Sequence, residues 1–232
     1  MGKRLIVAID GPSGAGKGTV ARALAVRLGY RHIDTGAMYR ALAWKATRDG
    51  LDLADEAAIA GLGERAAFDL EGGRVSIDGH DVRREIRTPE MDKAAAAVAR
   101  HPAVRTVLVE RQRAFGEGGG VVMEGRDIGT VVFPEADVKV YLDASPEERA
   151  RRRAADPAHA SSRTAQLSEV ATALAERDKS DSTRKVSPLS VAAKATVIDT
   201  TGVSVEDVID RVLALVDLEG TKTPRHQDTK TI

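Results

Sequence analysis

The feature that most constrains this chain is a glycine-rich loop, GPSGAGKGT, at positions 11–19. It directly follows the apolar run Leu5 to Ile9 and precedes a helical pattern that starts near Val20. Its four glycines allow backbone turns that a side chain would forbid, so several N–H groups can converge on phosphate oxygens. A strand, this loop and a helix in succession therefore predict a phosphate-binding site at the positive end of the helix.

The whole loop is the candidate site for a nucleoside triphosphate, through Gly11, Pro12, Ser13, Gly14, Ala15, Gly16, Lys17, Gly18 and Thr19. Lys17 can reach the outer phosphates as a point charge, and the Thr19 hydroxyl is a candidate Mg²⁺ ligand. The common form of the motif has Ser or Thr directly after the lysine, whereas this chain has Gly18 there. A loop that ends in KGT resembles that of nucleoside monophosphate kinases rather than GTPases or motors.

Composition limits the kinds of partner. The chain has 232 residues, enough for a substantial core, and 35 basic residues balance 35 acidic ones. A neutral chain is not built for indiscriminate attraction to nucleic acids or membranes, so we expect small-molecule partners. Without cysteine there is no disulfide or thiolate metal site, and no apolar run approaches the length of a membrane span. We expect a cytoplasmic protein.

Short apolar runs of strand length alternate with longer stretches of helical periodicity. This pattern predicts an α/β fold with parallel strands and ligands beyond their carboxyl ends. The expected strands are Leu5 to Ile9, His32 to Asp34, Val121 to Glu124, Val138 to Leu142 and Thr196 to Ile198.

Helix boundaries can also be predicted. A first helix from Thr19 to Leu28 should end at Gly29, which suits the left-handed position after a helix. Ser145 and Glu148 predict a capping box for a later helix. The last helix should run from its cap, Ser204, to about Leu218.

Two segments break the alternation. From Phe68 to Val82, strand-like pieces joined at Gly72-Gly73 and Asp78-Gly79 predict a small antiparallel sheet, followed by a helix that starts near Thr88-Pro89. The polar segment Asp156 to Ser162 predicts either a mobile lid or an ordinary loop between two helices. The polar tail, residues 220–232, is expected to be disordered.

Two further motifs lie at expected strand ends. DTGAMYR carries Thr35, Tyr39 and Arg40 at the start of a helix, where an arginine can bind a phosphate or simply lie on the surface. VVMEGRDIGT brings Glu124, Arg126 and Asp127 to the mouth of the sheet. A carboxylate at a strand end commonly binds Mg²⁺, in places through water, so Glu124 is the second metal candidate.

Arginines gather around the possible lid, at Arg149, Arg151, Arg152, Arg153, Arg163, Arg177 and Arg184. The planar guanidinium matches two phosphate oxygens at once. We expect one or two of these side chains to contact a ligand and most of the others to be solvated or to cover helix surface.

These motifs, together with EIRTPE, RQRAF, KVYLDAS and ERDKSDSTR, resemble the bacterial cytidylate kinases over nearly the whole chain. The resemblance implies a five-stranded parallel sheet flanked by helices, an inserted monophosphate-binding region and a short lid. It also implies transfer of a phosphoryl group from ATP, with Mg²⁺, to CMP or dCMP. The corresponding boundaries are a core of residues 1–37, 102–153 and 165–219, a monophosphate-binding region at 38–101 and a lid at 154–164. We expect a monomer.

The resemblance also implies roles for single residues. Arg40 and Arg126 would hold the monophosphate, with Thr35 and Tyr39 beside it. Arg105 and Asp127 would read the cytosine edge, and Arg177 and Asp181 would bind the sugar hydroxyls. The residues expected to act on the phosphates in transit are Lys17, Arg126, Arg163 and Arg184. One departure is plain, because Ala94 to Ala97 stand where the family often offers a serine to the base.

A phosphate-binding loop also occurs in proteins of other function. Guanine-specific switches usually carry an NKxD motif, which this chain cannot form because it contains no asparagine. Only 3% of residues are aromatic, which argues against a single-stranded nucleic-acid binder. A kinase for another nucleotide or a metabolite such as shikimate is compatible with the scaffold, and only the resemblance favours cytidine.

Overall fold

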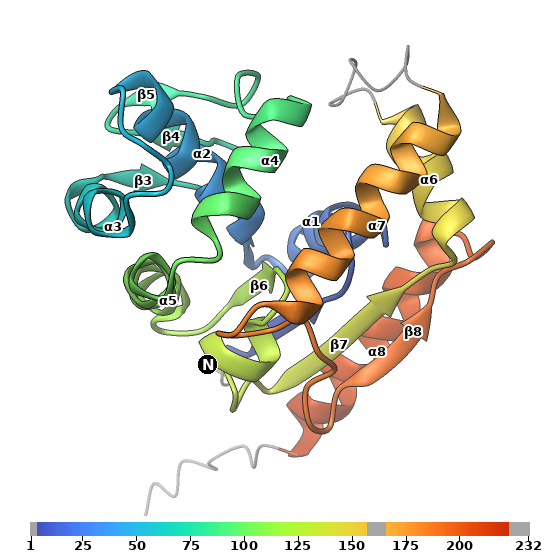
Figure 1. The fold of residues 1–232 in the computed structure, drawn as a ribbon. Helices are drawn as coiled ribbons and strands as arrows, with labels where there is room; N and C mark the ends of the chain where they lie inside the picture. Colours follow the sequence, from blue (N-terminus) through green and yellow to red (C-terminus); the bar gives the residue numbers. More distant parts are fainter. Residues whose placement is uncertain (1–3, 157–165, 223–232) are drawn as a thin grey trace, which may run out of the picture.

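The computed structural model describes residues 4–156 and 166–222, and a five-stranded sheet lies at the centre of the fold (Figure 1). The strand order is β2-β6-β1-β7-β8, and every neighbouring pair is parallel. The strands are β1 (Ile6–Asp10), β2 (Arg31–Asp34), β6 (Val121–Glu124), β7 (Val138–Asp143) and β8 (Thr196–Asp199). The expected parallel sheet is confirmed, with each strand end within a residue of its predicted place.

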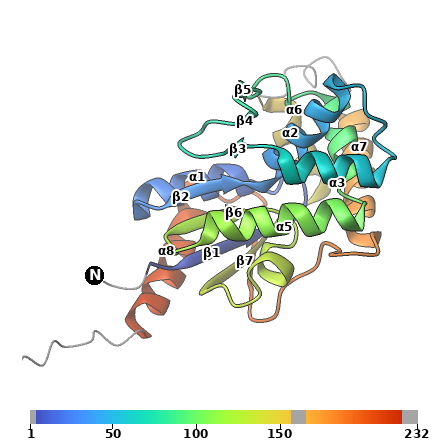
Figure 2. The same ribbon diagram turned by 90° about the vertical axis from the view of Figure 1, so that its left-hand side faces the viewer.

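Helices cover both faces of the sheet because successive strand residues point to opposite sides. On β1, Val7 and Ile9 pack in one apolar cluster with α1 (Lys17–Leu28) and α8 (Val205–Lys222). Ala8, between them, belongs to the cluster on the other face, where α5 (Pro102–Gly116) runs along the sheet (Figure 2). Two cores therefore hold β1 in the middle of the molecule, with its carboxyl end at the glycine-rich loop.

The small antiparallel sheet is confirmed between α3 (Glu56–Arg65) and the following helices. It has three strands, β3 (Phe68–Asp69), β4 (Ser76–Ile77) and β5 (His80–Asp81). Asp78 and Gly79 join the last two with φ values of 49° and 77°, the positive pair that a tight two-residue hairpin turn requires.

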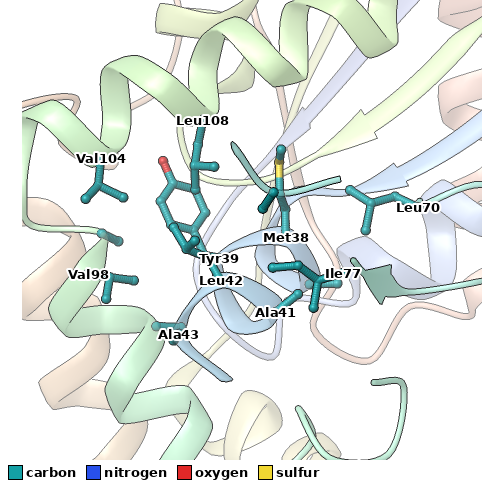
Figure 3. Packing of buried hydrophobic residues seen from close by; sticks show 14 of the residues in the cluster. Met38, Tyr39, Ala41, Leu42, Ala43, Leu70, Ile77, Val98, Val104 and Leu108 are labelled. Carbon is teal, nitrogen blue, oxygen red and sulfur yellow. The ribbon is translucent and has the colours of Figure 1, made fainter. Parts of the chain in front are cut away.

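Two further helices pack against each other beside the small antiparallel sheet. Helix α2 (Thr35–Arg48) packs on α4 (Pro89–Val98), which starts at the Thr88 cap as expected. Figure 3 shows Met38 and Leu42 of α2 in one apolar cluster with Val98 of α4 and Leu108 of α5. Alanines on both helices allow their backbones to approach closely, so α2 is firmly held and its polar face is presented to the site.

Helices α6 (Pro146–Ala155) and α7 (Leu167–Thr183) pack as a pair at the other side of the molecule (Figure 1). Ala150, Val170 and Leu174 form the small apolar cluster between them. Of the expected lid, residues 157–164 lie outside the described residues, and positions 154 and 155 belong to α6.

Three predictions about helix ends need correction. Helix α1 begins at Lys17, because Gly16 with φ of 90° is the last residue outside it. Ser145 caps α6 by accepting from the Glu148 N–H, but its own N–H donates to Thr201 Oγ1, so the reciprocal half of the capping box is absent. Helix α8 continues to Lys222, beyond Leu218 and into the tail; residues 223–232 lie outside the described residues.

Other predictions of helix ends are confirmed. Gly29 terminates α1 with φ of 63°, and Ser204 accepts from the Asp207 N–H at the start of α8. Across residues 4–156 and 166–222, no helix combines the length and the apolar character that crossing a membrane requires.

Candidate active site

A single cavity of about 780 Å³ lies at the carboxyl ends of β1, β2 and β6. It brings together most of the predicted site residues: Ser13, Gly14, Ala15, Gly16, Lys17, Gly18, Thr19, Thr35, Tyr39, Arg40, Arg105, Glu124, Arg126, Asp127, Arg177, Asp181 and Arg184. Gly11 and Pro12 belong to the loop but do not line the cavity, and Arg163 falls outside the described residues. The cavity also extends to Val203 and Val205 at the start of α8.

The glycine-rich loop is organised around Lys17. The lysine is buried, and its Nζ donates to the Pro12 carbonyl at 2.7 Å, so the loop curls over the side chain. Burial, reinforced by the nearby Arg126, lowers the pKa of Lys17 to about 7. Phosphate groups bound in the loop would favour the charged form and raise this pKa again.

Gly18 has a different role from the other loop glycines. Gly11, Gly14 and Gly16 have positive φ values, as the predicted turns require, but Gly18 is inside α1. A Cβ at position 18 would lie 3.1 Å from Glu124 Oε1. The prediction that Gly18 serves a backbone turn is therefore wrong, because its value is the space that it leaves for a carboxylate. This explains why no serine or threonine directly follows Lys17.

Glu124 is placed to face α1 by two neighbouring contacts. His32 Nε2 lies 2.9 Å from Glu124 Oε1, and the Thr35 hydroxyl donates to the Glu124 backbone carbonyl at 2.7 Å. The carboxylate is buried, and Glu124 and Thr19 both line the cavity. The described residues contain no cluster of three or more acidic or histidine side chains that would enclose a metal ion by themselves. One carboxylate and one hydroxyl fit Mg²⁺, which commonly takes few protein ligands and completes its shell with water and phosphate oxygens.

An arginine pair lies at the start of α2. Arg40 and Arg87 each donate an Nη2 hydrogen to Asp34 Oδ2, at 3.3 and 3.2 Å. Although burial opposes it, these two cations hold the pKa of Asp34 below its usual value. Asp34 also caps α2 through the Ala37 N–H, which fixes the guanidinium groups beside the helix start. Arg87 was missed by the sequence reasoning, although it is part of EIRTPE, a motif that carried the family resemblance.

A second charged group lies deeper, between α5 and the end of β6. Arg105 Nη2 donates to Asp127 Oδ2, and the Arg184 guanidinium lies 3.7 Å from Asp127 Oδ1. Arg105 also lies over the Tyr39 ring, 5.6 Å from its centroid. The residues expected to read the base are thus brought into contact with one another.

The Asp181 carboxylate on α7 is in contact with three arginine side chains. Arg126 donates to it at 2.9 Å, Arg177 donates at 3.4 Å, and Arg184 lies 3.5 Å away. These cations lower the pKa of Asp181 against the effect of burial. The carboxylate therefore holds guanidinium groups from the segment after β6, from α7 and from the residue after α7 in one place.

Donor groups without partners mark the same region as a binding site. Among the described residues, Arg40 Nε, Arg105 Nε and Arg184 Nη2 are buried and have no hydrogen-bond partner. Leaving a buried donor on a charged group unsatisfied is costly, so each is explained if a ligand supplies the acceptor.

The prediction about the exposure of the arginines on α6 needs correction. Most were expected to be solvated or to cover helix surface, and only Arg151 is largely exposed. Arg149 donates to the Ser13 carbonyl at 3.2 Å, and Arg153 donates to the Ser13 hydroxyl at 2.7 Å. Arg152 donates to the Thr200 hydroxyl and carbonyl. Their targets are separated from them by tens of residues or more, so the local sequence could not reveal these contacts.

Comparison with known proteins adds to this geometry. The family model described as cytidylate kinase matches residues 7–218. A cytidylate kinase from Pelotomaculum thermopropionicum is 52% identical over 90% of this chain and 95% of its own length. A cytidylate kinase from Desulfitobacterium hafniense is 49% identical, over 93% and 94% of the two chains. Another, from Geobacter sulfurreducens, is 48% identical over 95% and 96%.

Proposed function

The chain belongs to the cytidylate kinase family and phosphorylates CMP and dCMP. From this premise we propose which side chains bind the donor, which bind the acceptor and which stabilise the phosphoryl group in transfer. As a kinase of this family it uses ATP. The observation that carries the proposal is that one cavity is lined both by the glycine-rich loop and by the Arg105–Asp127 pair.

We assign the donor to the loop. Backbone N–H groups of residues 11–19 would surround the triphosphate, with the Lys17 ammonium at its outer phosphates. Thr19 and Glu124 would hold Mg²⁺, Glu124 either directly or through water, and the ion would neutralise charge on the phosphate oxygens. The buried carboxylate facing Gly18 supports this assignment.

We assign the acceptor phosphate to Arg40 and Arg126, with Thr35 and Tyr39 beside it. Arg40 keeps an unpaired Nε in the cavity, and Arg126 lies between the loop and Asp181. An arginine fork suits a phosphate because it offers two parallel donors. The cavity position of Arg87 makes it a further candidate for this phosphate.

We assign the rest of the acceptor to the deeper groups. Asp127 would accept from the cytosine N4 amino group, as carboxylates do in groove recognition, and Arg105 would donate to the base. Uracil offers a carbonyl oxygen at the same position, which a carboxylate repels. Arg177 and Asp181 would bind the sugar hydroxyls, and Asp181 already holds three guanidinium groups that a ligand can rearrange.

Direct in-line transfer accounts for the chemistry with these residues. The second pKa of a phosphate is about 6, so the acceptor is largely ionised at neutral pH and needs no general base. What remains is to hold two mutually repelling anions in line and to stabilise the charge that spreads over the moving group. Lys17, Arg126, Arg184 and Arg163 are the cations that we propose for this task.

A panel of nucleoside monophosphates tests the assignment. ADP release from ATP is followed with CMP, dCMP, UMP, AMP and GMP as acceptors, with the wild type and Asp127→Asn. We expect turnover with CMP and dCMP, and a ratio of kcat/KM for CMP over UMP that falls by about 10- to 100-fold in the variant. An unchanged ratio would remove Asp127 from base recognition.

Monomeric state, cytoplasmic location and the lack of nucleic-acid or membrane partners stay predictions.

A further inference from the structure

Asp10, the last residue of β1, is a buried carboxylate to which no role has been assigned so far. It is 3% exposed, and both of its oxygens accept backbone hydrogen bonds. Oδ1 accepts from the Ile128 N–H at 2.8 Å and Oδ2 from the Gly129 N–H at 2.7 Å. These two donors come from a segment more than a hundred residues away, directly after Arg126 and Asp127 in the chain.

That segment is η1 (Ile128–Val132), a single π-helical turn. The first N–H groups of a helical segment have no partner within it and need acceptors from elsewhere. An aspartate at the position before the first turn normally supplies one with its own side chain. Asp127 occupies this position, yet its side chain makes no capping hydrogen bond. Asp10 does so instead.

The Asp127 carboxylate is consequently available for other contacts. Its backbone carbonyl accepts the Val131 N–H at 2.9 Å, as a capping residue should, but its side chain points to Arg105 and Arg184. Turned toward these two arginines, the carboxylate makes no hydrogen bond to the N–H groups of η1. The acceptor for these N–H groups is instead Asp10 on β1.

We propose that Asp10 is a positioning residue for base recognition: it caps η1 from the neighbouring strand and thereby leaves the Asp127 carboxylate to the acceptor nucleotide. This inference rests on the proposed role of Asp127. A carboxylate suits the task because it offers an acceptor oxygen to each of two donors, whereas an amide of the same shape offers one acceptor and one donor.

Burial raises the pKa of Asp10 to about 6, with the two N–H donors opposing the rise. A buried carboxylate with a raised pKa is a cost to the fold, which is unexpected at a position that only fills space. A neutral amide removes this cost, so Asp10→Asn is expected to fold while losing one of the two caps.

The test is a double-mutant cycle of Asp10→Asn and Asp127→Asn, with KM and kcat measured for CMP, UMP and ATP. Asp137→Asn is the matched control, because Asp137 Oδ2 accepts from the Ile6 N–H at the opposite end of the same strand. Asp10→Asn should raise KM for CMP and lower the CMP-over-UMP ratio about tenfold, while KM for ATP stays within about twofold. The double variant should differ from Asp127→Asn by less than about twofold, because the two residues act in series.

The outcomes separate the inference from its premise. If Asp127→Asn keeps wild-type discrimination, the proposed role of Asp127 fails and the inference fails with it. If Asp127→Asn loses discrimination while Asp10→Asn keeps it, or if the two losses multiply, only the inference about Asp10 is overturned. Equal increases in KM for CMP and ATP would show a general structural role and would also overturn it. Should Asp10→Asn not fold, Asp10→Ser, which also has one acceptor oxygen, takes its place in the cycle.

Discussion

Replacing Gly18 with alanine is the sharpest test of how the phosphate loop and Glu124 fit together. The new Cβ would lie 3.1 Å from Glu124 Oε1 and 3.5 Å from Oε2, closer than ordinary van der Waals contact for the first of these. The carboxylate must shift by a few tenths of an ångström, and we expect this shift to break its contact with His32 Nε2, now at 2.9 Å.

The magnitude follows from two opposing effects. A hydrogen bond to a charged group contributes about 1.5–3 kcal/mol, and the pair concerned is largely buried. Alanine in a helix is favoured over glycine by at most about 1 kcal/mol. The free energy of unfolding should therefore fall by about 0.5–3 kcal/mol, which lowers Tm by about 1–12 °C for a chain of this size.

Catalysis should change as well. If Glu124 helps to hold Mg²⁺, its displacement raises the Mg²⁺ concentration that gives half-maximal ADP release. Calorimetry measures Tm. A Mg²⁺ titration at saturating ATP and CMP measures the Mg²⁺ concentration that gives half-maximal ADP release. Gly61→Ala is the matched control, because Gly61 is also helical and its Cβ would meet only the mobile end of Arg65. If Gly18→Ala is as stable as this control and needs no more Mg²⁺, Gly18 does not make room for the Glu124 carboxylate.

Three further changes test other parts of the structure. Lys17→Ala should lower kcat by about 10²-fold or more, in the range found when one charge-stabilising donor is removed, with an unchanged circular dichroism spectrum; wild-type turnover would remove the assigned role. Gly11→Ala should lose several kcal/mol or fail to fold, because a Cβ there would lie 2.0 Å from the Leu142 carbonyl oxygen. Gly50→Ala, with positive φ but open space, should lose only about 1–2 kcal/mol in urea unfolding, and equal losses would contradict the clash. Because the pKa of Asp10 is raised from 3.8 to about 6, its contribution to stability is present at low pH and is lost as pH rises through about 6. The stability of the wild type relative to Asp10→Asn should thus fall by about 2.5 kcal/mol between about pH 4 and pH 7, and a constant difference in urea midpoints would exclude it.

Local patterns were sufficient for the strands of both sheets and for several helix ends. The alternation of apolar runs with helical periodicity gave the five strands, because burial on both faces of a parallel sheet requires continuous apolar residues. Asp78-Gly79 predicted a hairpin turn and Gly29 a helix end, since both depend on backbone angles that few residues adopt. The glycine-rich loop predicted where a phosphate binds for the same reason.

Local patterns could not predict contacts between segments that are distant in the sequence. The reason for Gly18 is a carboxylate on β6, the cap of η1 is an aspartate on β1, and the partners of Arg149 and Arg153 lie in the phosphate loop. The sequence by itself determined which segments become strands and helices and which chemical groups the chain carries to the sheet edge. Only the tertiary structure decided which carboxylate meets which cation, because hydrogen bonds and charge pairs depend on separations of a few ångströms between residues far apart in the chain.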